Sequence, residues 1–551
     1  MTATTILEFL SFLSAELAGR DMPPPWPPDA FGLAAALLME SGAYLSVVSK
    51  WPNSGIAQDG FLEGLPEEWC GRIADIGSAW RQSWDRGSAP EEIAFWWKVV
   101  RSHSNLTLGQ ISANKSVFCA LLQICAAADE ACTGVGLVAE DRFGIASEVQ
   151  LLPNRKTGST LCKEIDPSKL RVLPKFHTPQ TGLSLRSLSH HLALWTSVDA
   201  TPLWFTVTDP EEPHSLSLLL IPWPTAVTPR QFVPAEPHFG SILNMPKEGF
   251  GFFSYHHKAD PEALGRLQRI YHAAEELTGR VDGVVLPELA VDEIEYQQIR
   301  DWVTGQKSLL IAGVGAPSEG VRPGKNRVAI DVPTARVVEK GKGHRVSAFQ
   351  NKHHRWRLDR SQIVQYGLGG QLDPSRRWWE HIEVEARRLV FLSLQPWLSI
   401  CALVCEDLAR QEPVARLVRA VGPNLVIALL MDGPQLASRW PARYATVLAD
   451  DPGSSVLTFT SIGMCEFSRP AGRPPSRTVA LWKDALSGAA QEIALPAGAD
   501  AILLNLVRHM DEEWTADGRS DGGGSGYPAL AGVHPVFVRE VDKVLSERSR
   551  K

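Results

Sequence analysis

The stretch SICALVCEDLAR, residues 399–410, is an apolar run that ends on a thiol, Cys405, and continues at once with Glu406 and Asp407. It closes a longer apolar segment, RRLVFLSLQPWLSICALVC, which begins at residue 387. Such continuous hydrophobic character is typical of a strand buried on both faces of a sheet. A thiol that only fills core space behaves as a small apolar group and needs no charged neighbours. The stretch therefore predicts a buried strand and raises the question of whether Cys405 is a nucleophile.

Strand-like and helix-like segments alternate on both sides of this stretch, from about residue 215. The strand candidates include SLSLLLIPWP, VDGVVLPE, KSLLIAGVGAP and NLVIALLM. Between them lie segments with apolar residues at helical spacing, such as DPEALGRLQRIYHAAEELTGR, where Asp260 is placed as the N-cap and Pro261 in the first turn. Buried strands that alternate with helices predict an α/β domain over residues 213–512, with functional groups at the strand ends.

Three chemically active side chains end strand-like segments: Glu288 in GVVLPE, Lys352 in SAFQNKHH and Cys405 in ICALVC. The pKa of a free thiol is about 8.5, so a cysteine nucleophile needs a base or a cation beside it. We expect Glu288 to be that base and Lys352 to stabilise an oxyanion, provided that the fold brings them together. Taken singly, Glu288 could be a loop or capping carboxylate, Lys352 one member of a basic surface run, and Cys405 an inert core thiol.

The same three residues, in this order and in these surroundings, resemble the carbon–nitrogen hydrolase (nitrilase) superfamily. The resemblance runs from about residue 215 to about residue 507 and includes NRVAIDVPTARVV ahead of the lysine and GPNLVIALLM after the nucleophile. It implies a four-layer α-β-β-α sandwich in which Cys405 is the nucleophile, Glu288 the general base and Lys352 the oxyanion stabiliser. Attack on a linear amide or nitrile would give a thioester or thioimidate, with no metal ion or organic cofactor. The family tends to associate through its helical faces, which implies a homo-oligomer.

The residues after the thiol depart from the commonest pattern of that family. Many members have an aromatic residue in the position of Glu406, while Asp407 occupies the usual acidic position. The sequence CED is most similar to the glutaminase-type branch, such as the glutaminase attached to NAD synthetases. This similarity favours an amidase over a true nitrilase, although no ATP-using synthetase domain accompanies it in this sequence.

The segment after the lysine departs from the pattern as well. The family often places a second glutamate soon after the lysine to orient it. At the matching distance this chain has Asp359, in RWRLDRSQ, and no glutamate before Glu380. Asp359 is therefore expected to support Lys352. The run HHRWRLDR, which begins at His353, is basic and aromatic, a composition that fits an anionic substrate or a nucleic acid as well as a plain solvated loop.

The remaining segments divide the chain further. Residues 1–133 have apolar residues at intervals of three or four between Pro and Gly breaks, which predicts a helical accessory domain. Residues 134–212 contain short strand-like segments and are expected to form a connecting region. Residues 513–551 contain WTADGRSDGGGSGYPALAG, which predicts a Gly-rich loop ahead of a C-terminal helix.

The composition bounds the class of protein. The 551 residues are 44% hydrophobic and 21% charged, as in soluble globular proteins, and the formal net charge of −7 argues against a surface that coats nucleic acid. Eight cysteines at irregular spacing indicate free thiols in a reducing compartment, without a metal-binding pattern. The apolar N-terminus carries Glu8 and Glu16 and lacks a basic leader, so a cytoplasmic location is expected.

A second class of function stays open. A nitrilase-like scaffold retained as a binding or assembly module would keep these strands without their chemistry, while the N-terminal region docks a protein or nucleic-acid partner. Nitrilase-like domains with large accessory regions also occur in bacterial antiviral systems, so antiviral defence is a further alternative. If Cys405 is activated, it is expected to alkylate before the other cysteines.

Overall fold

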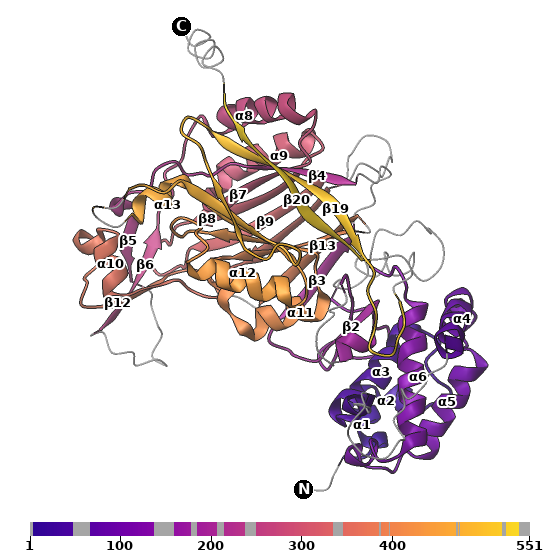
Figure 1. Cartoon of the computed structure of the whole chain (residues 1–551). Helices are drawn as coiled ribbons and strands as arrows, with labels where there is room; N and C mark the ends of the chain where they lie inside the picture. Colours follow the sequence, from indigo (N-terminus) through magenta and orange to yellow (C-terminus); the bar gives the residue numbers. More distant parts are fainter. Residues whose placement is uncertain are drawn as a thin grey trace.

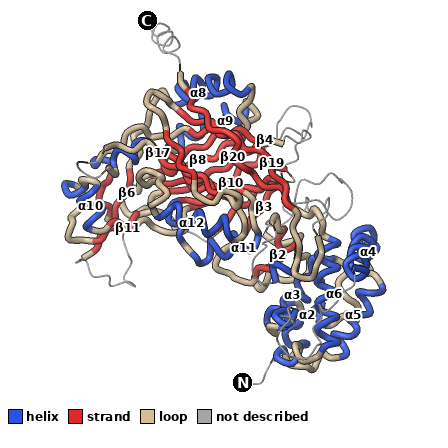
Figure 2. The backbone as a smooth tube through the Cα atoms, viewed as in Figure 1, coloured by secondary structure: helices blue, strands red, loops and turns tan. Residues whose placement is uncertain are grey.

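Two seven-stranded sheets lie face to face at the centre of the molecule (Figures 1 and 2). The first has the order β10-β9-β8-β7-β4-β19-β20 and consists of β4 (Ser215–Leu220), β7 (Gly283–Val291), β8 (Leu309–Ala316), β9 (Lys325–Pro333), β10 (Arg345–Asn351), β19 (Ala501–Asp511) and β20 (Ser525–Val536). The second has the order β18-β17-β16-β15-β14-β13-β3 and consists of β3 (Thr201–Thr206), β13 (Arg388–Gln395), β14 (Leu398–Val404), β15 (Leu425–Leu430), β16 (Ser455–Thr460), β17 (Thr478–Lys483) and β18 (Gln491–Ala494).

The computed structural model describes most of the chain. It covers residues 4–47, 67–136, 159–177, 185–206, 214–236, 249–333, 345–384, 387–395, 397–469, 472, 474–520 and 525–538. No helix within these ranges is long and apolar enough to cross a membrane.

Apolar side chains on the facing sides of the two sheets form one core. Leu218, Leu220 and Val285 contribute from the first sheet, and Leu392 and Leu403 from the second. In the second sheet β14, β15 and β16 are parallel, and in the first sheet β4, β7 and β8 are parallel. Parallel strands of one sheet end at the same edge, so residues that follow these strands gather there.

Helices cover the outer faces of the sheets. Helices α8 (Ala263–Thr278) and α9 (Glu293–Gly305) pack on the first sheet through a separate apolar cluster that includes Leu267 and Ile299. Helix α12 (Trp440–Asp450) packs on β16 and β17 of the second sheet, and α11 (Arg416–Val421) adds Leu417 to the same core. The central part of the chain is therefore of the α/β class.

A third sheet extends one end of the sandwich. It has the order β11-β12-β6-β5, with β5 (Phe232–Ala235), β6 (Phe250–Tyr255), β11 (Arg357–Leu358) and β12 (Arg377–Glu380), and is followed in space by helix α10 (Arg360–Gln365). An aromatic cluster of Phe232, Phe253, Trp356 and Tyr366 fills its inner side and includes Leu289 from β7. This sheet, which the sequence patterns did not predict, contributes a residue to the candidate site.

The N-terminal part of the chain contributes helices and no strands within its described residues up to 136, and lies at one end of the molecule (Figure 1). Its helices are α1 (Ile6–Leu13), α2 (Ala15–Ala18), α3 (Pro27–Glu40), α4 (Glu67–Ser83), α5 (Glu91–Ser102) and α6 (Lys115–Ala131). Trp80, Trp97 and Cys125 are almost completely buried among them. These side chains therefore pack as core groups, as their helical spacing predicts.

The connecting region contributes to both neighbours. Strands β1 (Arg171–Pro174) and β2 (Leu192–Trp195) form a two-stranded sheet that contacts α3, and β2 also contacts α11. Strand β3 pairs in parallel with β13 and is the edge strand of the second sheet. The segments 137–158 and 207–213, where further short strands were predicted, lie outside the described residues.

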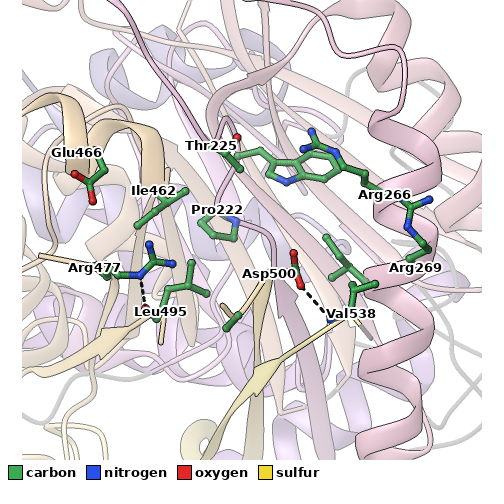
Figure 3. Close-up of a pocket in the computed structure, with 13 residues that line it drawn as sticks. Pro222, Thr225, Arg266, Arg269, Ile462, Glu466, Arg477, Leu495, Asp500 and Val538 are labelled. Atoms are coloured by element: carbon green, nitrogen blue, oxygen red, sulfur yellow. Dashed lines mark hydrogen bonds between the residues drawn. The ribbon is translucent and has the colours of Figure 1, made fainter. Parts of the chain in front are cut away.

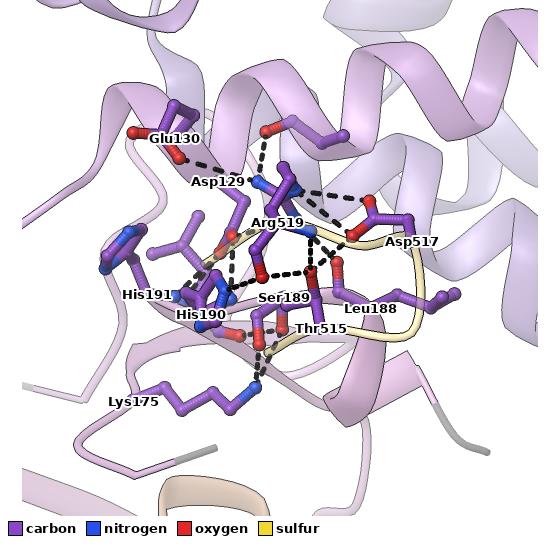
Figure 4. A network of polar contacts seen from close by, with 12 residues as sticks. Asp129, Glu130, Lys175, Leu188, Ser189, His190, His191, Thr515, Asp517 and Arg519 are labelled. Atoms are coloured by element: carbon purple, nitrogen blue, oxygen red, sulfur yellow. Dashed lines mark hydrogen bonds and ion pairs between the residues drawn. The ribbon is translucent and has the colours of Figure 1, made fainter. Parts of the chain in front are cut away.

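A buried polar network joins α6, the segment before β2 and the segment between β19 and β20 (Figure 4). The Arg519 guanidinium is 3.3 Å from the carboxylate of Asp129 and 3.2 Å from that of Asp517, and it donates to the carbonyls of Ala126 at 3.1 Å and Leu188 at 2.8 Å. Asp129 also accepts the backbone N–H groups of residues 190–192 at 2.7–2.9 Å. Glu130 is a third carboxylate partner, 3.7 Å from Arg519, so a buried cation with three carboxylates attaches the helices to the sheets.

The sequence predicted a Gly-rich loop at the start of residues 513–551, and this prediction is wrong for residues 525–536. Residues 525–536 form β20, which pairs with β19 along its whole length. A Cβ atom on Gly526 would lie 2.4 Å from the Cβ of Trp397, so this glycine permits a close approach rather than a flexible turn. Pro528 and Pro535 are tolerated because β20 is an edge strand. The predicted C-terminal helix lies outside the described residues.

Candidate active site

Glu288 is positioned by an irregularity in β7. The pairing of β7 with β8 shifts register between Leu286 and Val291, so the intervening residues bulge, and Leu289 has φ of +54°. A Cβ atom on Gly313 of β8 would lie 2.1 Å from the carbonyl oxygen of Pro287 and 2.5 Å from the Cα of Glu288. Bulges re-aim side chains near functional sites. Gly313 is therefore required for the backbone path that presents Glu288.

Lys352 follows β10 and lies between two carboxylates. Its Nζ is 2.9 Å from Oε1 of Glu288 and 2.8 Å from Oε2 of Glu380. The Asn326 amide nitrogen donates to Oε1 of Glu288 at 2.7 Å and to Oε1 of Glu380 at 2.8 Å. The backbone N–H of Met431 donates to Oε2 of Glu288 at 2.5 Å. Every oxygen of Glu288 thus has a donor, which fixes the carboxylate in one orientation.

Cys405 begins the short 3₁₀ turn Cys405–Ala409, directly after β14. Its φ of +46° lies in the left-handed region, which costs a residue with a side chain roughly 1–3 kcal/mol and persists only where the surroundings enforce it. Asp407, fully buried in the same turn, accepts the backbone N–H of His353 at 3.0 Å and contacts the ring Nδ1 of His354 at 2.9 Å. The turn that carries the thiol is therefore tied to the loop that carries Lys352.

A further contact holds the two sheets in register near the site. The Gln350 side chain, in β10 of the first sheet, donates to the carbonyl of Ala402 in β14 at 2.8 Å and accepts the N–H of Val390 in β13 at 2.9 Å. It is fully buried and lies two residues before Lys352. Glu288, Lys352 and Cys405, which are remote in the sequence, thus lie at one end of the facing sheets. Their charges act on one another, since both Glu288 and Lys352 shift the pKa of the Cys405 thiol.

Two factors determine the electrostatics of the Glu288–Lys352–Glu380 cluster: the side chains are buried, and negative charges outnumber positive ones. Glu288, Lys352 and Glu380 are 2%, 1% and 3% exposed, and one ammonium faces two carboxylates. Burial, and then the negative charge of Glu380, raise the pKa of Glu288 above its ordinary value although Lys352 acts in the opposite direction. Burial alone would lower the pKa of Lys352, but the two carboxylates raise it well above its ordinary value. Lys352 therefore stays charged, while Glu288 is the group prepared to accept a proton.

The resting thiol is protonated. Burial, followed by the Glu288 carboxylate, raises the pKa of Cys405 well above that of a free cysteine, and Lys352 only partly offsets this. Cys405 is also only 5% exposed. A buried thiol with a raised pKa reacts slowly with alkylating reagents, so the expected fast alkylation of Cys405 stays an untested prediction. If Cys405 acts as a nucleophile, its proton therefore has to leave as it attacks.

The other site residues expected from the sequence lie in different roles. Asp359 is the N-cap of α10 and accepts the N–H of Gln362 at 3.0 Å, whereas the second carboxylate beside Lys352 is that of Glu380. The expectation for Asp359 is therefore corrected. Glu406 is partly exposed and lies 3.3 Å from Arg410.

The basic run after Lys352 is partly buried rather than solvated along its whole length, although Arg357 and Arg360 are exposed. His353 is buried, and its ring Nε2 lies 2.8 Å from the carbonyl of Arg388. Arg355 donates to the carbonyl of Glu380 at 3.0 Å, and Trp356 belongs to the aromatic cluster. Both residues therefore hold the end of β12, and with it Glu380, against the loop that carries Lys352.

Sequence reasoning passed over Glu380 because it follows Lys352 at an unusual distance. The sequence did contain an indication of this role, because Glu380 is the first glutamate after Lys352. The carboxylate reaches the lysine because β12 pairs with β6, where Gly251 lets the Trp378 ring lie within 2.8 Å of the position of a Cβ atom. Within the described residues, no group of three or more His, Cys, Asp or Glu side chains could hold a metal ion.

Comparison with known proteins gives structural neighbours only. No protein-family model matches the sequence, and no curated protein matches it. Among solved structures, the chain is similar to a mutant of the amidase from Nesterenkonia sp. AN1, with 13% identity and a TM-score of 0.31 over 53% of this chain and 92% of that chain. It is also similar to Saccharomyces cerevisiae Nit3, a member of branch 10 of the nitrilase superfamily, with 13% identity and a TM-score of 0.27 over 61% and 95% of the two chains. The carbon–nitrogen hydrolase from Helicobacter pylori G27 has 10% identity and a TM-score of 0.26 over 61% and 93%. At these values the likeness carries no argument about chemistry, which rests on the geometry of the site.

Proposed function

We propose that the chain is a cysteine-dependent hydrolase of a non-peptide C–N bond, with Cys405 as nucleophile, Glu288 as general base and Lys352 as oxyanion stabiliser. The observation that carries the proposal is the buried Glu288–Lys352–Glu380 cluster beside a cysteine on left-handed backbone at a strand end. Packing alone does not account for it, because a buried cluster of one cation and two carboxylates is costly to desolvate. Together with the sheets and their covering helices, this site supports assignment to the nitrilase superfamily.

The first half of the reaction follows from the charges. Sγ of Cys405 attacks the amide carbon while its proton passes to Glu288, whose raised pKa makes it a stronger base than an ordinary carboxylate. The carbonyl oxygen becomes an oxyanion, which Lys352 and the backbone N–H of Glu406 stabilise. One such preorganised donor is worth about 3–4 kcal/mol of barrier. Collapse of this intermediate breaks the C–N bond, Glu288 returns the proton to the leaving amine, and a thioester to Cys405 remains.

The second half regenerates the thiol. Glu288 removes a proton from water, the resulting hydroxyl adds to the thioester carbon, and collapse releases a carboxylic acid and Cys405. Throughout, Glu380 and Asn326 keep Lys352 and Glu288 in place and touch no reacting atom in this scheme. For the glutaminase-type substrate that CED favours, the products would be ammonia and a carboxylate, whereas a nitrile would pass through a thioimidate.

Ammonia release from a panel of linear amides, glutamine and nitriles tests the proposal. Cys405→Ala is expected to abolish release, while Cys401→Ala, which removes the buried thiol within β14 four residues earlier, is expected to retain it. Mass spectrometry of wild-type protein quenched with acid during turnover of an active substrate should detect the acyl group on Cys405. Release unaffected by Cys405→Ala would remove the proposed nucleophile.

The scaffold alternative predicts a different outcome. If the chain is a binding module in antiviral defence, the biological phenotype should survive Cys405→Ala and depend on the N-terminal region that would dock a protein or nucleic-acid partner. If it is an enzyme, the phenotype should be lost with Cys405→Ala and retained with Cys401→Ala.

A further inference from the structure

A cavity of about 280 Å³ lies between the end of β4, helix α8 and the segment before β17 (Figure 3). Pro222, Ile270, Ile462 and Val538 give it an apolar lining. Its volume is near the lower end of the range of small-molecule sites, about 300–1,000 Å³. None of the proposed catalytic residues lines it, so it is separate from the candidate active site.

Three arginines line this cavity from opposite sides. Arg266 and Arg269 lie one turn apart on α8, and Arg477 faces them from the segment before β17 (Figure 3). Arg266 has an ion pair with Asp260, and its guanidinium lies 4.9 Å from the ring centre of Trp223. Arg477 donates to the carbonyl of Leu495 at 2.9 Å. Among the described residues, neither Arg269 nor Arg477 has a carboxylate partner.

Two carboxylates, those of Asp500 and Glu466, also lie on the lining. Asp500 accepts the backbone N–H of Val538, another lining residue, at 3.0 Å, and Glu466 lies 4.0 Å from Arg469. Arg269 and Arg477 thus present two guanidinium groups to a concave, partly apolar site without an ion pair within the described part of the chain. A cation in such a site is stabilised by an anion that excludes water from it, and guanidinium groups bind planar or tetrahedral oxyanions with paired hydrogen bonds.

We propose that this cavity binds a small molecule through an oxyanion group, a phosphate or a carboxylate, held by Arg269 and Arg477 with Arg266 beside them. The apolar part of the ligand lies against Ile270 and Ile462. A second cavity, of about 450 Å³, shares Trp223, Thr225 and Arg266 with the first and gives a longer ligand room to extend. The site is independent of the hydrolase proposal, because no proposed catalytic side chain belongs to it.

Titration calorimetry with the full chain tests the site, with inorganic phosphate as one probe and succinate as the other. We expect one-to-one binding with a Kd of about 1 mM or tighter for at least one probe, weakened by added salt. Arg269→Gln is expected to raise that Kd about tenfold, through loss of a charge-assisted contact. Arg376→Gln, which changes an arginine outside the cavity that pairs with Asp373, is the matched control and should leave the Kd unchanged.

The two probes distinguish a phosphate-bearing from a carboxylate-bearing ligand. Arg269 makes no described ion pair, so its variant should keep the wild-type melting temperature. Arg477→Lys gives a second measurement, since it keeps the charge but loses the paired hydrogen bonds. Cys405→Ala protein should bind both probes as the wild type does, which separates this proposal from the hydrolase. Absence of binding to both probes, or equal binding by wild type and Arg269→Gln, would overturn it.

Discussion

At the scale of single residues, Glu380 and Asp359 are the informative pair. Glu380 bonds to Lys352 and Asn326 and accepts the backbone N–H of Trp356 at 3.1 Å, whereas Asp359 caps a helix. We predict that Glu380→Gln lowers kcat about 100-fold. The physical reason is that Lys352 would then neutralise Glu288 alone, so the pKa of Glu288 would fall and the base would become weaker.

The sign of this effect can be checked in the pH–rate profile. Glu380 raises the pKa of Glu288, so its neutralisation should move the acid limb of kcat/KM to lower pH. Asp359→Asn is the control: it should leave the profile in place and destabilise the fold by about 1 kcal/mol or less, through a weaker cap. A profile shifted by Asp359→Asn instead would return the supporting role to that residue.

The residue types of the site were predictable, but their environment was not. Lys352 and Cys405 directly follow β10 and β14, as expected for functional groups of an α/β fold, whereas Glu288, expected at a strand end, lies at the bulge within β7. The position of Glu380 depends on the pairing of β12 with β6, which no local pattern encodes. The raised pKa of Cys405 likewise depends on burial by segments far away in the chain.

At the scale of secondary-structure elements, the bulge in β7 makes a prediction about Gly313. The Cβ of Gly313→Ala would collide with the backbone at Pro287 and Glu288, so we expect a loss of roughly 1–3 kcal/mol of stability. Displacement of Glu288 by about 1 Å should also lower kcat about 100-fold. Gly305→Ala, at the end of α9 with open space around it, should keep full activity and gain up to about 1 kcal/mol. Equal activity of the two variants would show that the bulge does not position the base.

Helix α3 contains a titratable carboxyl group, that of Asp29, which lies outside the candidate active site. Asp29 in its first turn is fully buried and accepts the backbone N–H groups of Lys163 at 3.1 Å and Glu164 at 3.2 Å. Burial raises the pKa of Asp29 to about 7. The folded protein therefore holds a proton that the unfolded chain releases near pH 4, so this contribution to stability is present at low pH and is lost as pH rises to 7.

We predict that ionisation of Asp29 lowers the free energy of unfolding by about 3 kcal/mol as the pH rises from 5 to 8. Asn mimics the protonated carboxyl, so Asp29→Asn should flatten that part of the pH dependence. Chemical denaturation of both proteins across this range measures the difference, in which other titrations largely cancel. Parallel curves for the two proteins would show that Asp29 titrates at its ordinary pKa.

Helices and buried strands could be predicted from their periodicity, and the glycine-rich strand could not. The segments around α3, α5 and α6 have apolar residues at helical spacing, and β7 and β14 are continuous apolar runs. Strand β20 was missed because Gly526 and Gly532, which resemble loop residues in a sequence, allow close approach of side chains in space. Tertiary contacts decide such segments, so local patterns mislead there.

At the scale of the whole molecule, Arg519 predicts how the helices stay attached. Arg519→Ala would leave Asp129 and Asp517 buried without their cation, at a cost of roughly 3–5 kcal/mol. We expect the N-terminal helices to separate first, seen as a second unfolding transition and as faster hydrogen exchange in α6. Arg376→Ala, which removes a surface ion pair, should change stability by less than about 1 kcal/mol. A single, unshifted transition in Arg519→Ala would contradict the attachment.

The homo-oligomer expected from the family resemblance stays a prediction. Helix α11, on one helical face of the sandwich, packs against β2, and Arg416 lies 5.5 Å from the ring centre of Trp195. Part of that face is therefore occupied by the chain's own connecting region. Light scattering would give the mass of the particle, and a monomer would indicate that this covering replaces self-association.

The pairing of β3 with β13 bears on whether the N-terminal half can be cut away. A chain that begins after residue 206 would leave the backbone of residues 388–393 unpaired along a rim of the second sheet. Exposed sheet edges of this kind pair with strands of other molecules, and the protein then aggregates. A truncated chain of this kind that proves insoluble would thus say nothing about whether residues after 206 contain an active site. A cut placed upstream of Thr201 keeps this strand and gives the fairer test.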